Sequence, residues 1–197
     1  MEEIKTAFEI AMEKAAEIGE PTKEEREKIK AQERLNSILA RFNKEEIDAN
    51  ELWKLLKEEG KEEIFKEAQK RLIESLRLKD SLHETQRKRE GILAIETLKE
   101  DKKIPEVEAL LNTLQEIQKR YDEEMKMTYN NFRIQVERNP ELRIREIQQQ
   151  DTKIVVQLSV EDAIEQLPEW RYFLSELNTR YESKFQEILN RLLEVIK

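Results

Sequence analysis

The chain has 197 residues, of which 41% are charged and 38% hydrophobic, with 3 glycines, 4 prolines and no cysteine. This composition is typical of helices with wide solvated faces, so we expect an all-α protein. The net charge of −8 argues against a general nucleic-acid binder, because such proteins use lysine and arginine to displace counterions. The absence of cysteine excludes disulfides, thiolate zinc sites and cysteine nucleophiles.

Nothing in the sequence points to a membrane. No apolar run approaches the roughly 18 residues of a membrane span, and the opening MEEIKTAFEI is too acidic and polar for a signal peptide. We therefore expect a cytoplasmic protein with no membrane partner.

The N-terminal half is expected to contain several short helices. An amphipathic helix is predicted over residues 2–18, with Gly19 placed to end it. A second helix is predicted over residues 23–42, because Thr22 and Glu25 have the spacing of a capping box.

Three further helices follow in this half. Asp48 or Asn50 is predicted to cap the first of them, which runs to Gly60, and this glycine is either a stop or a kink before the next amphipathic run. Ser81 and Glu84 repeat the capping-box spacing and predict the start of another helix.

Two stretches of the C-terminal half share one apolar spacing. It averages close to the natural turn of an α-helix, so it predicts two nearly straight helices, each with one apolar seam. We expect a long helical hairpin over residues 101–197, with arms beginning near Pro105 and Pro168, packed as one cooperative unit on a helical region over residues 1–100. The seams are Leu114, Ile117, Tyr121, Met125, Thr128, Phe132, Val136 and Leu174, Leu177, Tyr181, Phe185, Ile188, Leu192, Ile196.

The connection between the arms is ambiguous in sequence. Asn139-Pro140 must break, kink or re-cap the first arm. The following ELRIREIQQQ contains good helix formers and favours a helix to about Gln149, although Leu142 and Ile144 also alternate. TKIVVQLS then predicts a short extended segment near residues 152–158, before a short helix that Ser159 caps.

The hairpin alone cannot account for its own stability. Burying about ten seam side chains yields on the order of 15–30 kcal/mol, whereas ordering about forty-five residues costs roughly 1–2 kcal/mol each. Other helices of the chain or a second copy must cover the arms. We expect both, with a homodimer as the oligomer.

No catalytic, cofactor-binding or metal-binding residue is predicted. His83 is the only histidine, and Asp80 lies three residues before it, where the two could share a helix face. A di-iron bundle needs two Glu-x-x-His motifs and a zincin needs two histidines, so the chain fits neither pattern. We interpret His83 as an ordinary polar residue and the chain as a non-enzyme, with a metal-dependent helical enzyme as the most distant alternative.

Basic residues concentrate in two places. One is Arg87-Lys88-Arg89, and the other forms a stripe if the first arm continues past Pro140 as a helix. Such a stripe could touch RNA or an acidic protein, which makes a chaperone or ribosome-associated factor the first alternative. Charge balance on an exposed helix is the favoured interpretation. The members of the second group are Arg133, Arg138, Arg143 and Arg145.

Large aromatic residues are the other candidates for contact sites. Trp53 and Trp170 could anchor a partner, but we interpret Trp170, in the first turn of the last arm, as a core plug. Tyr121 and Tyr181 occupy matching seam positions and predict packing rather than catalysis. The β-like TKIVVQLS is the best candidate for a partner site, because an unpaired strand can join another edge, including that of its own copy.

Three stretches of the chain resemble a family of uncharacterised bacterial helical proteins that is known only as a domain of unknown function. They are IKTAFEIAMEKAAEIGEPT, REGILAIETLKEDKKIPEVEALLNTLQEIQKRYDEEM and TKIVVQLSVEDAIEQLPEWRYFLSELNTRYESKFQEIL. The resemblance implies a helical, coiled-coil-like fold but no reaction and no active-site residue. Asn139-Pro140 departs from the uninterrupted helix that the resemblance implies.

The sequence therefore favours a protein that binds another macromolecule or itself. We expect a protein–protein interaction or self-assembly module with an unidentified protein partner, and the hairpin arms with residues 139–159 as its working surface.

Overall fold

The computed structural model describes residues 22–149 and 152–197, so the helix predicted over residues 2–18 and its end at Gly19 lie outside the described residues. The described chain is mostly helical with one small sheet, which confirms the all-α class. Its elements are α2 (Lys23–Asn43), α3 (Ala49–Glu59), α4 (Glu62–Glu74), α5 (Leu82–Glu96), α6 (Ile104–Arg138), the 3-10 turn η1 (Pro140–Arg143), β1 (Ile144–Gln149), β2 (Thr152–Gln157), α7 (Val160–Gln166) and α8 (Pro168–Val195).

The helix starts follow the predicted caps. Thr22 and Ser81 each close a capping box with the glutamate three residues further on. Asp48, rather than Asn50, caps α3 by accepting a hydrogen bond from the amide of the third helical residue. Gly60 ends α3 with a φ of 64°, a left-handed conformation that glycine adopts without steric cost, so this glycine is a stop.

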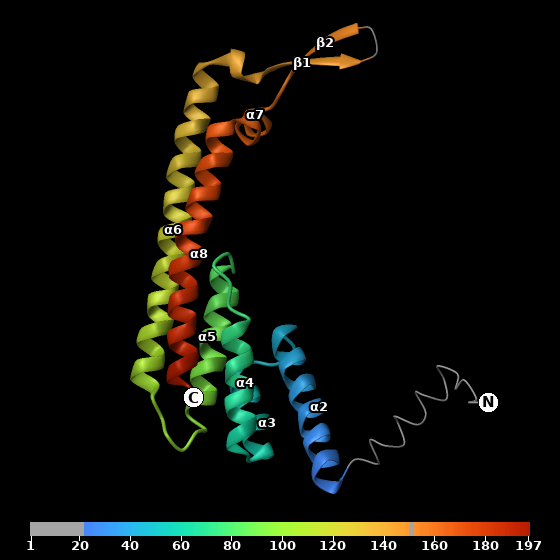
Figure 1. Cartoon of the computed structure of the whole chain (residues 1–197), viewed down its shortest axis with the longest axis vertical. Coiled ribbons are helices and arrows are strands. Elements are labelled where there is room, and N and C mark those ends of the chain that lie inside the picture. Colours follow the sequence, from blue (N-terminus) through green and yellow to red (C-terminus); the bar gives the residue numbers. More distant parts are fainter. Residues whose placement is uncertain (1–21, 150–151) are drawn as a thin grey trace, which may run out of the picture.

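Helices α6 and α8 run antiparallel and form the predicted long hairpin (Figure 1). Every predicted seam position is buried or half-buried. The rings of Tyr121 and Tyr181 meet edge to face with their centroids 5.7 Å apart, an arrangement that aromatic pairs favour. The two seams therefore seal against each other, as their shared spacing predicted.

Helices α2 to α5 form a bundle along one half of the hairpin (Figure 1). Their apolar faces join that half of the seams in one core, which extends from Ala31 in α2 to Ile196 after α8. Packing is close where α5 meets α2, because a Cβ added at Gly91 would lie 2.8 Å from the Phe42 ring. The bundle thus supplies part of the cover that the arms were predicted to need.

A buried polar cluster fastens the end of α8 to the bundle. The Nζ of Lys99 donates to Glu96 Oε2 at 3.0 Å, to Gln69 Oε1 at 3.1 Å and to the Ile196 carbonyl at 3.2 Å. Burial raises the pKa of the Glu96 carboxyl, but hydrogen bonds from Gln69, the Lys103 amide and Lys99 outweigh burial and hold that pKa below its usual range. The lysine charge also suits the negative end of the α8 dipole.

A second, smaller core lies in the other half of the hairpin, where α7 packs against α6 and α8. Trp170 is at its centre, with the rings of Tyr129, Phe132 and Phe173 between 5.5 and 5.7 Å away. Trp170 is therefore a core residue, as the sequence predicted. The buried members of this core are Val136, Ala163, Ile164, Leu167 and Trp170.

The connection between the arms differs from the prediction at one point. The prediction of a helix to about Gln149 is wrong, because α6 ends at Arg138 and is followed by η1 and then by β1. β1 pairs antiparallel with β2, the predicted extended segment, with Ile144 opposite Gln157. Pro140 cannot donate a helical hydrogen bond, and Asn139 before it is non-helical at φ −126° and ψ 85°. The ladder with β2 then outweighs the local helix propensity of the segment.

Candidate interaction surface

The upper half of the hairpin projects beyond the bundle as an arm (Figure 1). The α4–α5 turn reaches the hairpin where Gln118 Nε2 donates to the Arg77 carbonyl at 2.8 Å and Lys79 Nζ lies 5.8 Å from the centre of the Tyr121 ring. Beyond this level Figure 1 shows only the ends of α6 and α8, with η1, α7 and the two strands. We call the described part of residues 122–176 the distal arm.

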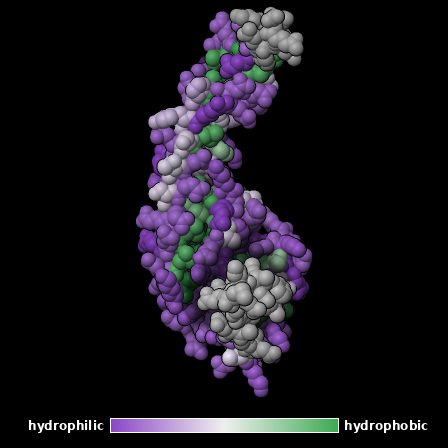
Figure 2. All heavy atoms as spheres, turned by 45° about the vertical axis from the view of Figure 1, so that its right-hand side comes forward, coloured by the Kyte–Doolittle hydropathy of each residue, from purple (hydrophilic) through white to green (hydrophobic). Residues whose placement is uncertain are grey.

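Exposed large apolar side chains gather on the distal arm. The described residues include seven exposed large apolar side chains, and two of them, Ile29 and Leu82, belong to the bundle. The other five lie on the arm. Figure 2 shows apolar atoms at the surface near the tip of the arm, and a longer apolar stripe on the lower part of the rod, at the level of the bundle. These five are Met127, Ile134, Ile144, Val155 and Tyr172.

Ile144 and Val155 lie within residues 139–159, which the sequence already favoured as part of the working surface. Met127, Ile134 and Tyr172 were not predicted, because they lie off the two seams. Met127 and Ile134 are seven residues apart in α6, so they share a helix face that is not the seam. Apolar residues at repeated off-seam positions were therefore the available signal. Tyr172 in α8 gave no comparable periodic signal.

A polar layer forms the base of the distal arm. The Tyr121 hydroxyl donates to Asn178 Oδ1 and the Tyr181 hydroxyl donates to Glu124 Oε2, both at 2.9 Å. Arg180 donates to the other oxygen of Glu124. Burial and the Glu124 carboxylate raise the pKa of Tyr181. Burial raises the pKa of Glu124 itself, but the hydrogen bonds from Arg180 and Tyr181 lower it further, so its net shift is downward. These tyrosines pack against each other and form hydrogen bonds between α6 and α8.

The predicted arginine stripe does not form along one helix, because α6 ends at Arg138. Arg133 Nε pairs with Glu137 Oε1 at 2.9 Å, and this hydrogen bond raises the pKa of the guanidinium. Arg143 Nε donates to the Leu158 carbonyl at 2.8 Å, and Arg145 Nε donates to Gln166 Oε1 at 3.0 Å. The latter two arginines therefore tie the start of β1 to the chain around α7.

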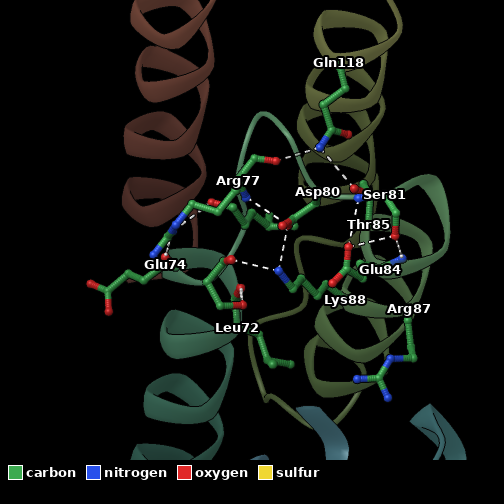
Figure 3. Close-up of polar contacts among 12 residues, drawn as sticks. Leu72, Glu74, Arg77, Asp80, Ser81, Glu84, Thr85, Arg87, Lys88 and Gln118 are labelled. Atoms are coloured by element: carbon green, nitrogen blue, oxygen red, sulfur yellow. Dashed lines mark hydrogen bonds and ion pairs between the residues drawn. The ribbon is translucent and has the colours of Figure 1, made fainter. Parts of the chain in front are cut away.

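The structure does not pair His83 with Asp80 as a site. Asp80 Oδ2 accepts from Lys88 Nζ at 2.6 Å and from the Arg77 amide at 2.9 Å, within a network that braces the α4–α5 turn (Figure 3). His83 is exposed, with Nε2 3.6 Å from Glu45 Oε1. Lys88 from the first basic group thus has a structural role.

Trp53 is half-buried rather than displayed as an anchor. Its indole Nε1 donates to Thr97 Oγ1 at 2.9 Å, and Lys57 Nζ lies 4.5 Å from the ring centre. The hydrogen bond to Thr97 joins α3 to the end of α5, whereas Lys57 lies within α3 itself.

A groove of about 730 Å³ lies between α4 and the end of α8. Leu193 and Ile196 line it together with lysines and glutamates of both helices, and Lys66 Nζ donates across it to the Lys197 carbonyl at 3.2 Å. The mixed charges give this groove no preference for one ligand charge.

Two further features are absent from the described residues. None of the helices within residues 22–149 and 152–197 is long and apolar enough to cross a membrane. In the same residues, no group of three or more histidine and carboxylate side chains is placed to hold a metal ion.

Comparison with known proteins places the chain in a family. No curated protein and no solved structure matches it. Residues 50–194 match DUF6657, described as a family of unknown function. The match runs from α3 through α8 and includes the whole distal arm, whereas α2 precedes it. The chain therefore belongs to the DUF6657 family, which confirms its resemblance to a family of unknown function.

Proposed function

We propose that the chain is a non-enzymatic, cytoplasmic module for protein–protein interaction or self-assembly, and that the distal arm is its working surface. The observation that carries this proposal is the gathering of five exposed large apolar side chains on the arm, against two on the bundle. Exposed apolar groups that recur on one projection are typical of surfaces that another protein covers.

The construction of the arm supports this role. Its own core around Trp170 holds the ends of α6 and α8 in one shape, so binding needs little ordering of the arm. At about 1.5 Å per residue, α6 is roughly 50 Å long, which carries the tip well clear of the bundle. The arm can therefore present its surface to a partner without obstruction from α2 to α5.

The alternatives gain no comparable support. A chaperone or ribosome-associated factor was expected to present Arg133 to Arg145 on one face, but Arg143 and Arg145 have left the helix and bind neighbouring chain atoms. A metal-dependent enzyme was expected to use His83 with Asp80, whose carboxylate accepts from Lys88 and the Arg77 amide.

The test compares exposed apolar residues on and off the arm. Met127→Lys with Ile134→Lys places two charges on the arm, and Ile29→Lys places one on α2, where the side chain is 51% exposed. Proteins captured from a native lysate and the solution mass of each full-length variant are measured. We expect the arm variant to lose captured proteins or self-association and the α2 variant to keep both. An unchanged captured set and unchanged mass for the arm variant would contradict the proposal.

A further inference from the structure

The strands β1 and β2 form a sheet with two outer edges at the tip of the distal arm (Figure 1). Among the helices of residues 22–149 and 152–197, none packs extensively against either strand. An isolated two-stranded sheet is only marginally stable in water, and its outer edges offer unpaired N–H and C=O groups to another strand. The tip is thus suited to strand addition.

The ladder defines which backbone groups point outward. The Leu158 amide donates to the Arg143 carbonyl at 2.8 Å, so these directly opposite residues form a hydrogen-bonded pair. Such pairs alternate with non-bonded pairs along an antiparallel ladder. In the established register, the backbone groups of Lys153, Val155 and Gln157 therefore point away from β1.

This outer edge of β2 is complementary to itself. When two β2 strands pair antiparallel about a two-fold axis at Val155, every residue whose backbone points outward lies opposite such a residue of the second copy. Val155 then lies opposite Val155, and Lys153 lies opposite Gln157. No like charges face each other. The same operation at the outer edge of β1 is centred on Glu146 and sets two carboxylates opposite each other, which is destabilising.

The exposed side chains at the tip favour the same pairing. Val155 is 64% exposed and Ile144 is 46% exposed. Ile144 lies opposite Gln157, two residues from Val155, so both side chains are on one face of the sheet. Joining two copies through β2 brings two such pairs together on one face and places the two Val155 side chains in cross-strand contact.

We propose that the β2 edge pairs with β2 of a second copy of this chain, so that two hairpins form a four-stranded sheet in the order β1–β2–β2–β1. This inference rests on the proposed function and adds a self-association contact at the tip of the arm, apart from Met127 and Ile134 in α6. The contact is short, so the dimer belongs to the weak, concentration-dependent class.

The experiment measures the dimer dissociation constant of the full chain by analytical ultracentrifugation, up to about 1 mM, where weak association becomes measurable. Val155→Lys sets two ammonium groups opposite each other at the centre of the pairing and is expected to weaken the dimer by about tenfold or more. Ile144→Lys is the matched control, with the same substitution on the same face but on β1, and is expected to dimerise like the unmodified chain.

A charge-pair rescue separates edge pairing from damage to the fold. A mixture of the Val155→Lys and Val155→Glu chains is expected to form a mixed dimer tighter than either variant alone, because opposite charges then meet across the edge. A monomeric unmodified chain, equal effects at positions 155 and 144, or failure of the rescue would each overturn the inference. The proposed function has a separate test, since Met127 and Ile134 lie outside the sheet.

Discussion

The buried cluster at the end of α8 allows a sharp test of how the hairpin is held. Lys99 is only 3% exposed, and Lys99→Met keeps a side chain of similar length but removes the ammonium group. The carboxylate of Glu96, 0% exposed, then keeps hydrogen bonds from Gln69 and the Lys103 amide but loses its only cationic partner within the cluster. The carbonyl of Ile196 also loses the Lys99 donor.

The expected loss follows from these contacts. Each buried acceptor left without a donor costs about 1–3 kcal/mol, and removing one partner of a buried ion pair costs about 3–5 kcal/mol in total. We expect Lys99→Met to lower the free energy of unfolding by about 3–5 kcal/mol. Adding Glu96→Gln should restore part of this loss, because no unpaired charge then remains buried.

The assay is urea unfolding at neutral pH followed by helical circular dichroism. The control is Lys102→Met, an exposed residue in the same connection, expected to change stability by less than about 0.5 kcal/mol. A loss below about 1 kcal/mol for Lys99→Met, or a double variant less stable than the single one, would refute the reasoning.

Three further predictions follow from particular residues. Leu177, 0% exposed in the seam, becomes a buried unpaired carboxylate in Leu177→Asp, so the variant should lose more than about 4 kcal/mol or fail to fold; a thermal melt like that of the unmodified chain would rule this out. Gly91→Ala should lose about 1–3 kcal/mol despite the higher helix propensity of alanine, because its Cβ meets the Phe42 ring, and Phe42→Leu in the same chain should recover part of the loss. A gain in melting temperature for Gly91→Ala alone would show that the contact relaxes freely. Because the folded-state pKa of Glu96 is lowered, its contribution to stability is present above the unfolded-state pKa of about 4.3 and is lost as the pH falls through the folded value. Glu96→Gln should flatten the acid side of the stability profile, and an unchanged slope would contradict this assignment.

The sequence favoured the hairpin arms and residues 139–159 as the working surface, but it did not determine which side chains are exposed there. The β-like character of TKIVVQLS was visible because valine and isoleucine fit a pleated strand. Its partner β1 was not, since IREIQQ is locally compatible with a helix and becomes a strand only when β2 lies beside it. The exposure of Met127 and Ile134 likewise depends on where the bundle stops along the hairpin.

Among the described residues, the sequence by itself determined most of the helices and the caps that start them, apart from the helix wrongly expected to about Gln149. Side-chain caps at Thr22, Asp48 and Ser81 act within one helical turn, and the seam spacing of α6 and α8 is a property of each helix alone. Tertiary structure decided where the bundle helices meet the hairpin, because burial depends on neighbours that are distant in the chain. Lys99 lies 97 positions from the carbonyl of Ile196 that it binds, and no local pattern encodes such a contact.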